Sequence, residues 1–379
     1  MATTLVTLDK IREINATFPY TAPIKAWKAQ GKKVVGFQCV HVPEEIIYAA
    51  GILPVRLTGD TKESELEEAN SYMYMNYCSF IRTCLQLTLD GQFSFLDGYV
   101  GGGTCDCARR LADIFDHYHL TPFVHILSVP RKIDGAAYEA FRLQLMDMKR
   151  ALEEHFKVEI TDEKLWKAVE VYNKGRDLLR QLHELKKLDA PPITGAETLE
   201  VLNASRRMPP EQFNELMEKL LEEARTGGRA IKPRYRLMIN GSPLNNPEFI
   251  KTIESQGALV VIDELCTGIR YWWEGVDPDP DPLKAIAKRY LHNFACPRME
   301  PSEDRFIRVM KLVKQYRVDG VVNGIVRHCV PWAHDEPMLR RKLEAKGIPV
   351  LELDLEYGTG SPGPILTRIE AFLEMLETK

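Results

Sequence analysis

The chain alternates between segments typical of buried strands and segments typical of helices, and this alternation occurs in two separate blocks. Short apolar runs next to glycine or proline predict the strands, and stretches that open with proline or an acidic turn predict the helices between them. Such alternation favours parallel sheets with helices on their faces. The predicted strands are 33–38, 52–57, 96–100 and 123–127 in the first block and 235–240, 258–263, 319–326 and 349–353 in the second.

The stretch between the two blocks, from Gly135 to Arg225, shows only helical patterns. Its apolar residues recur at spacings of three and four, as one face of an amphipathic helix requires. We therefore predict an α/β protein with two Rossmann-like parallel-sheet lobes linked by a helical insert. The predicted domains are an N-terminal lobe at 1–133, the insert at 134–230 and a C-terminal lobe at 231–379.

Composition and charge argue against several classes of protein. The 379 residues are 45% hydrophobic and 27% charged, with a formal net charge of −4, which predicts neither a nucleic-acid nor an anionic-membrane partner. No apolar run approaches the ~20 residues that span a bilayer. The first residues lack the basic and then apolar pattern of a secretory signal. We therefore expect a cytoplasmic protein.

The eight cysteines are too sparse for a disulfide scaffold, and no C-x₂-C pair suggests a zinc ribbon. Buried cysteines often act only as small apolar side chains. Four of them, however, follow predicted strands, two in each lobe: Cys39, Cys105, Cys266 and Cys329. Ligands of open α/β sheets bind beyond the carboxyl ends of the strands. If the lobes face each other, these thiols meet in one cleft.

The remaining cysteines divide into ligand candidates and bystanders. Cys105 lies at the start of a predicted helix, a position that lowers a thiol pKa, whereas Cys107 is two residues further on and should point elsewhere. Cys78 and Cys84 do not share a helical face either, so we expect one ligand in each pair. Cys296 precedes a proline, as in some iron–sulfur ligation runs. Clusters rich in thiolate and poor in histidine favour iron–sulfur or zinc, and we predict an iron–sulfur cluster between the lobes.

Six short motifs lie at 42–56, 77–82, 104–106, 265–270, 290–297 and 367–372. Taken together and in this order, they resemble the family of benzoyl-CoA reductases and 2-hydroxyacyl-CoA dehydratases, and the likeness covers nearly the whole chain. Near the C-terminus many members carry Gln a few residues before Thr-Arg, whereas this chain reads Gly363-Pro-Ile-Leu-Thr-Arg368.

The resemblance implies an enzyme subunit of the smaller type, with α/β lobes around a [4Fe-4S] cluster held by Cys78, Cys105 and Cys329. It also implies a paralogous cluster-binding subunit and an ATP-hydrolysing iron–sulfur activator supplied by a ferredoxin-type donor. The implied substrate is an acyl-CoA that is reduced at its carbonyl to a ketyl radical. Benzoyl-CoA reductases go on to reduce the aromatic ring to a dienoyl-CoA, and dehydratases eliminate water.

One branch of the family holds a larger, double-cubane [8Fe-9S] cluster with six cysteines, and Cys39, Cys266 and Cys296 match its additional three. Three activities therefore stay open. An ATP-dependent benzoyl-CoA reductase subunit is the leading interpretation, ahead of a 2-hydroxyacyl-CoA dehydratase subunit and a double-cubane reductase of small molecules. A fourth alternative is a scaffold subunit whose paralogue does the catalysis.

Individual residues near the cysteines are candidates for the substrate site. Arg270, Trp272 and Trp273 follow Cys266, and the flat tryptophan rings would suit an aromatic acyl group. Core packing or a subunit interface is the alternative for both tryptophans. His328, next to Cys329, is a candidate proton donor because histidine titrates near neutrality, and a structural hydrogen bond is its alternative.

Two further motifs have simpler interpretations. Glu44 and Glu45 lie side by side at a predicted helix start, where acidic residues complement the helix dipole. No G-x-x-x-x-G-K-[ST] motif occurs, so we do not expect the chain to bind ATP through a P-loop.

Overall fold

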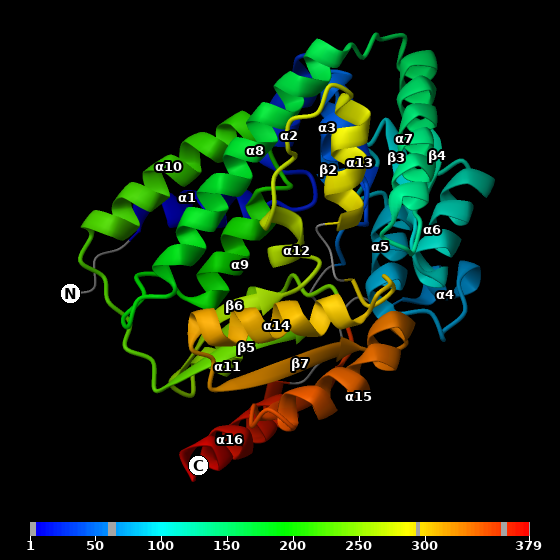
Figure 1. Ribbon diagram of the computed structural model, residues 1–379. Helices are drawn as coiled ribbons and strands as arrows, with labels where there is room; N and C mark the ends of the chain where they lie inside the picture. The colour runs from blue at the N-terminus through cyan, green and yellow to red at the C-terminus, as the bar shows by residue number, and fades with distance from the viewer. Residues whose placement is uncertain (1–4, 60–65, 293–295, 358–361, 379) are drawn as a thin grey trace.

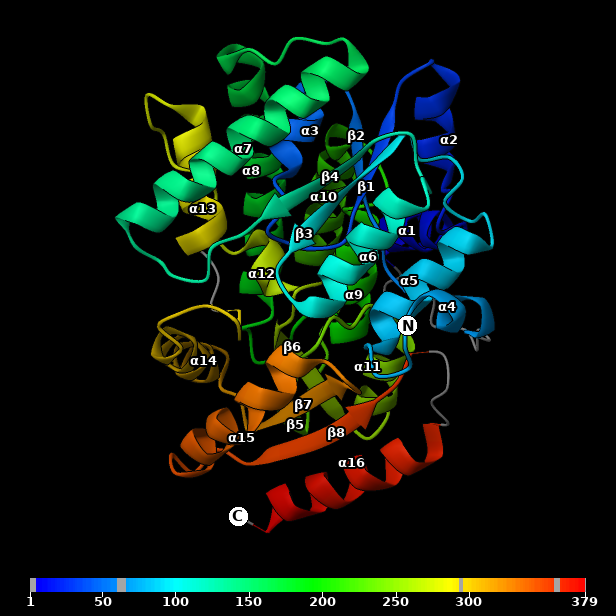
Figure 2. The same ribbon diagram turned by 90° about the vertical axis from the view of Figure 1, so that its right-hand side faces the viewer.

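The computed structural model describes residues 5–59, 66–292, 296–357 and 362–378. These residues form two four-stranded sheets whose paired strands are all parallel (Figures 1 and 2). The strand orders, β2-β1-β3-β4 and β6-β5-β7-β8, are the same sequence-order pattern used twice. The prediction of an α/β fold with two parallel-sheet lobes is confirmed.

The first lobe contains the N-terminal sheet and the helices that connect its strands. Its elements are α1 (Val6–Ala16), α2 (Ala22–Ala29), β1 (Val34–Phe37), α3 (Glu44–Ala49), β2 (Leu53–Arg56), α4 (Glu67–Tyr72), α5 (Ser79–Leu89), β3 (Gly98–Gly103), α6 (Asp106–His117) and β4 (Val124–Ser128). Strands β1 and β2 are buried along their whole length, as expected for a sheet covered on both faces.

Helices alone occupy the stretch between β4 and β5, as predicted. They are α7 (Gly135–Phe156), α8 (Asp162–Leu185), α9 (Gly195–Ala204) and α10 (Pro210–Thr226). The predicted apolar stripe of α7 is buried, with Phe141, Leu145, Met148 and Leu152 all 0% exposed. This stripe packs against the first lobe.

The second lobe repeats the alternation and ends with a long helix under the sheet (Figure 2). Its elements are β5 (Tyr235–Gly241), α11 (Pro247–Glu254), β6 (Ala258–Glu264), α12 (Ile269–Trp272), α13 (Pro282–His292), α14 (Glu303–Tyr316), β7 (Gly320–Val326), α15 (Val330–Glu344), β8 (Val350–Leu355) and α16 (Pro362–Glu377).

Most boundaries differ from the prediction by one or two residues, and two larger differences have physical reasons. The sequence pattern places the start of α15 at Glu336, but the helix begins at Val330 and continues through Pro337. Pro331 is accommodated because the first turn of a helix needs no N–H donor. Strand β3 continues into the glycines at 101–103, which the sequence pattern places after the strand. At Gly101 an added Cβ would lie 2.4 Å from the Ala112 Cβ, so glycine allows α6 to pack closely on the strand.

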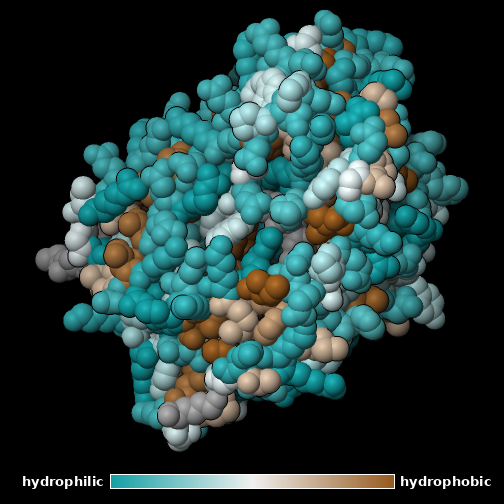
Figure 3. Space-filling view, viewed as in Figure 1, coloured by the Kyte–Doolittle hydropathy of each residue, from teal (hydrophilic) through white to brown (hydrophobic). Residues whose placement is uncertain are grey.

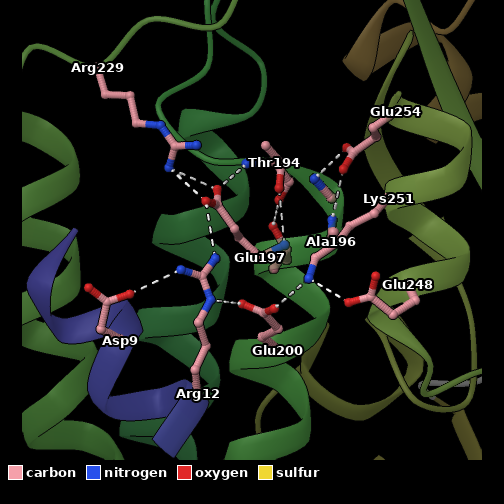
Figure 4. Close-up of polar contacts among 12 residues, drawn as sticks. Asp9, Arg12, Thr194, Ala196, Glu197, Glu200, Arg229, Glu248, Lys251 and Glu254 are labelled. Atoms are coloured by element: carbon pink, nitrogen blue, oxygen red, sulfur yellow. Dashed lines mark hydrogen bonds and ion pairs between the residues drawn. The ribbon is translucent and has the colours of Figure 1, made fainter. Parts of the chain in front are cut away.

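The sequence prediction missed helix α1, which is fixed to the insert by a polar network (Figure 4). The Arg12 guanidinium lies 2.8 Å from Glu200 and 3.5 Å from Glu197, both on α9. Glu200 also lies 3.5 Å from Lys251 on α11. The network therefore connects the N-terminal helix, the insert and the second lobe.

Three clusters of buried apolar side chains form the core, and each contains residues from more than one predicted domain. One cluster joins the two sheets through residues such as Leu53 and Ile239. The second joins the insert to the second sheet, and the third joins it to the first. Every cluster crosses a predicted boundary, so the packing of the core does not separate the predicted domains. The divisions at 133/134 and 230/231 stay predictions.

Within the described ranges, none of the helices is both long and apolar enough to cross a bilayer. The face shown in Figure 3 is largely hydrophilic, with apolar side chains in scattered patches.

Glu44 and Glu45 lie in the first turn of α3, as predicted, but the sequence did not reveal that both are buried. Glu45 Oε1 lies 2.5 Å from Arg176 Nη2, and Oε2 accepts a hydrogen bond of 2.7 Å from the Tyr290 hydroxyl. Glu44 Oε1 accepts one of 3.2 Å from Tyr271. Burial, together with the adjacent Glu45 carboxylate, raises the pKa of Glu44 to about 7.

This raised pKa predicts a pH-dependent stability. The pKa of Glu44 is about 7 in the folded chain and near 4.5 when the side chain is free in water. Its contribution to stability is therefore complete below pH 4.5 and is lost as the pH rises to 7. In Glu44→Gln, the fall in unfolding free energy between pH 5 and pH 8 should be smaller than in the wild type, by up to about 3 kcal/mol.

Urea denaturation at several pH values measures this difference. Glu374→Gln, at an exposed position of α16, is the matched control and should follow the wild-type curve. Parallel curves for Glu44→Gln and the wild type would contradict the prediction.

Candidate metal centre

A cavity of about 90 Å³ lies where the two lobes meet, and six of the eight cysteines line it. Three come from each lobe. The expectation that the thiols at the strand ends meet in one cleft is therefore confirmed. The six are Cys39, Cys78 and Cys105 of the first lobe and Cys266, Cys296 and Cys329 of the second.

The strand order explains why these positions converge. In both sheets the chain order reverses beside the first strand of the lobe, between β1 and β3 and between β5 and β7. Such a switch point opens a crevice at the carboxyl ends of the strands. Cys39 follows β1 and Cys105 follows β3, on either side of the first crevice. Cys329 follows β7 at the second.

Three of the thiols lie at the N-terminal ends of long helices that point into the cavity. Cys78 is the N-cap residue of α5, Cys105 of α6 and Cys329 of α15. The Cys105 sulfur accepts a hydrogen bond of 3.5 Å from the Ala108 N–H. A helix N-terminus carries partial positive charge and favours an anion. The sequence indicated this position for Cys105 only.

The thiol pKa values reflect burial opposed by these helix ends. Contact with Cys107, together with burial, raises the pKa values of Cys78 and Cys105, and burial raises that of Cys329 to about 11. In each of these three thiols, a hydrogen bond from the backbone N–H three residues further along the chain opposes this rise in pKa. At neutral pH the metal-free thiols are therefore protonated, and binding of iron would release their protons.

The other three thiols, Cys39, Cys266 and Cys296, lie in loops, and two of them contact side-chain donors. The Thr104 hydroxyl donates to the Cys39 sulfur at 3.4 Å, and Arg270 Nη1 donates to the Cys266 sulfur at 3.7 Å. Burial raises the pKa of Cys296 to about 12.

The two remaining cysteines do not line the cavity. Cys84 is 0% exposed within the core, and burial raises its pKa. Cys107 was expected to point away from the site of Cys105, and it does lie outside the cavity wall, but its thiol still interacts with those of both Cys105 and Cys78. The backbone of Cys105 is extended, so its side chain folds back over the first turn of α6, where Cys107 lies.

The remaining wall of the cavity carries positive charge and apolar surface. Arg56 and Arg298 line it, and both are buried. Burial lowers the pKa of His41, a third polar lining residue, to about 3, so its ring is neutral. Among the described lining residues there is no Asp or Glu. An anionic group thus suits this cavity.

The donor set fits an iron–sulfur cluster better than a single ion. Among the described residues, no three His, Cys, Asp or Glu side chains are grouped so as to bind one metal ion. In an iron–sulfur cluster each thiolate binds a different iron, so the sulfurs surround the group without meeting at a point. Six thiols around one cavity, with positive charge and no carboxylate on its described wall, have this chemistry.

The other predicted site residues lie outside the cavity. Trp272 is 1% exposed and its ring centroid lies 4.0 Å from that of His183, within the core. Trp273 lines a separate surface groove of about 570 Å³. His328 is exposed and has a left-handed backbone with φ of 65°. Arg270 is buried behind Cys266. Substrate binding and proton donation by these residues stay predictions.

Comparison with known proteins identifies the family. Residues 39–376 match the family described as 2-hydroxyglutaryl-CoA dehydratase, D-component. The chain belongs to this family. The matched segment begins at Cys39 and includes all six cysteines of the cavity.

The relatives include both reductases and dehydratases. YjiM of Escherichia coli (strain K12) is 29% identical over 360 residues, covering 92% of this chain and 93% of that protein. A benzoyl-CoA reductase subunit of Thauera aromatica is 24% identical, covering 93% and 94%. The beta subunit of (R)-2-hydroxyglutaryl-CoA dehydratase of Acidaminococcus fermentans is 27% identical, covering 97% and 98%. Membership of the benzoyl-CoA reductase and 2-hydroxyacyl-CoA dehydratase family is confirmed, and the family contains more than one reaction.

The packing around Cys39 gives a prediction for Gly102. A Cβ added there would lie 2.8 Å from the Cys39 Cβ, so either the strand or the cysteine must move. Gly102→Ala should lower the free energy of unfolding of the metal-free chain by about 1–3 kcal/mol. Gly135→Ala, where an added Cβ meets nothing within 4 Å, is the control. Equal denaturation midpoints for the two variants would show that the site tolerates the methyl group.

Proposed function

We propose that this chain is an iron–sulfur reductase whose six cavity cysteines hold one double-cubane [8Fe-9S] cluster. The observation that carries this proposal is that all six thiols line a single cavity. A single [4Fe-4S] cluster held by Cys78, Cys105 and Cys329 would leave three half-buried thiols, two of them with a side-chain hydrogen-bond donor, without a ligand role. Cysteines without a role would not be expected to gather on the wall of the same cavity.

The two sets of three thiols are supported in different ways, and each can act as one half of a larger site. Cys78, Cys105 and Cys329 lie at helix N-termini, whose N–H groups stabilise thiolates. Cys39 and Cys266 receive hydrogen bonds from Thr104 and Arg270. Each set supplies the three thiolates that the family resemblance assigns to one four-iron unit.

The chain's own residues would bind the cluster, balance its charge and exclude water. When bound, such a cluster supplies electrons at low potential. Arg56 and Arg298 offset the negative charge of the thiolates, and Phe80, Ile81 and Trp332 contribute apolar wall. Because the sequence has no P-loop, we propose that a separate ATP-hydrolysing iron–sulfur activator, supplied by a ferredoxin-type donor, delivers the electrons in the cytoplasm.

Iron and acid-labile sulfide, measured per chain in protein purified without oxygen, test the cluster type. We expect about eight irons, twice the content of one [4Fe-4S] cluster. Cys39→Ser and Cys105→Ser should both lower the iron content. Cys84→Ser, which removes a buried thiol outside the cavity, is the control and should leave it unchanged.

About four irons, unaffected by Cys39→Ser, would overturn the double-cubane proposal and support a second candidate function. In that case the chain is a subunit of an acyl-CoA enzyme, with a [4Fe-4S] cluster on Cys78, Cys105 and Cys329 and a paralogous partner subunit. The relatives favour this candidate, since two of those reported above are named as subunits of acyl-CoA enzymes and match over more than nine-tenths of their length.

Turnover by the cluster-loaded protein with its activator distinguishes the reactions. A benzoyl-CoA reductase subunit should consume electrons and convert benzoyl-CoA to a dienoyl-CoA, whereas a dehydratase subunit should convert a 2-hydroxyacyl-CoA with no net electron consumption. The double-cubane proposal predicts ATP-dependent electron consumption with small-molecule acceptors and no turnover of either thioester. Turnover of one thioester would assign the chain to that acyl-CoA reaction.

A further inference from the structure

Behind the Cys266 thiol lies a buried cluster of charged side chains packed around the ring of Trp332. It consists of Glu264, Arg270, Arg305 and Trp332, whose exposed fractions are between 1% and 2%. Glu264 is the last residue of β6, Arg270 lies in α12, Arg305 in α14 and Trp332 in α15. Four elements of the second lobe therefore place these side chains together, next to the cavity.

The Arg270 guanidinium connects this cluster to the thiol. Its Nη1 donates to the Cys266 sulfur at 3.7 Å, while its Nη2 lies 2.7 Å from Glu264 Oε1. The guanidinium carbon also lies 4.7 Å from the centroid of the Trp332 ring, which itself lines the cavity. One planar cation thus contacts a thiol, a carboxylate and an aromatic face at the same time.

Glu264 is the counter-ion that keeps this arginine in place. Its second oxygen lies 3.1 Å from Arg305 Nη2, and Arg305 forms a further ion pair with Asp335. Arg305 also lies 4.4 Å from the Trp332 ring centroid. Asp335 and Glu264 together oppose the positive charges of Arg305 and Arg270.

The loop between Glu264 and Arg270 is itself held in one conformation. The Asp263 carboxylate accepts hydrogen bonds from the N–H groups of Leu265 at 3.0 Å and Ile269 at 2.9 Å. A Cβ at Gly268 would lie 1.7 Å from the same carboxylate oxygen, so only glycine fits there. The backbone between Cys266 and Arg270 is therefore fixed by these hydrogen bonds and by the close approach at Gly268.

From this geometry we infer that Arg270 sets the reduction potential of the cluster bound through Cys266, with Glu264 as its opposing charge. The inference rests on the proposed function, because it requires Cys266 to bind iron. An N–H group directed at a ligand sulfur withdraws electron density and stabilises the reduced, more negative cluster, which raises its potential. Arg270 is a positioning and tuning residue, and it does not touch the substrate.

The arrangement predicts that substitutions of Arg270 and of Glu264 shift the reduction potential in opposite directions. Arg270→Gln removes the positive donor, and the reduced-to-oxidised ratio at a fixed potential should fall about tenfold, or 59 mV for a one-electron couple. Glu264→Gln removes the opposing negative charge and should shift the potential upward. Arg270→Lys keeps the charge but loses the planar fork, and should lie between Arg270→Gln and the wild type.

Redox titration monitored by electron paramagnetic resonance measures these potentials without any substrate. Arg176→Gln removes an equally buried arginine whose ion-pair partner is Glu45, and it serves as the matched control with an unchanged potential. Iron content is measured for each variant in parallel. If Arg270→Gln does not retain iron, Glu264→Gln decides alone: an upward shift supports the inference, and an unchanged potential overturns it.

Two results would overturn the inference in distinguishable ways. If Arg270→Gln and Glu264→Gln keep their iron and both leave the potential unchanged, or shift it in the same direction, Arg270 does not tune the cluster even though the proposed function holds. If Cys266→Ser retains the full iron content of the wild type, Cys266 binds no iron. The inference and the double-cubane proposal then fail together, while the single-cluster candidate function stands.

Discussion

The fold has to hold six thiols around one cavity between its lobes, and this is the constraint on which the rest of the structure depends. Burial opposes the thiolate form, and neighbouring thiolates repel one another. The chain offsets both effects with fixed positive ends: three helices begin at Cys78, Cys105 and Cys329, and buried arginines lie nearby. The absence of carboxylates from the described part of the wall follows from the same requirement.

Using one strand order twice is the simplest way to meet this constraint. Each sheet alone offers one crevice, at the point where its strand order reverses, and loops from one crevice could supply only a few ligands. Two such lobes, with their strand ends toward the same cavity, double the number of positions that can supply a ligand. The helical insert and α1 then fix the lobes to each other, through shared cores and through contacts such as that of Arg12 with Glu200.

The sequence predicted those features that repeat along the chain or lie at strand ends. The eight strands, the helical insert and the convergence of Cys39, Cys105, Cys266 and Cys329 all follow from periodicity and topology. Features that depend on contacts between distant segments were not predictable. The burial of Glu44 and Glu45 requires Arg176, more than 130 residues away, and the contact of Cys107 with Cys78 requires α5 and α6 to begin side by side. A pattern read along one segment contains no information about such partners.

The two sets of thiols also differ in how evolution or design could change them. Cys78 and Cys105 interact favourably with backbone N–H groups, which no substitution of a neighbouring side chain removes, whereas Cys329 also has the Ser242 hydroxyl as a partner. Cys39 and Cys266 depend on the side chains of Thr104 and Arg270, and these can be replaced one at a time. A family that keeps the first set and varies the second could therefore change its cluster, and with it the accessible potential, while the lobes and their helix ends stay the same.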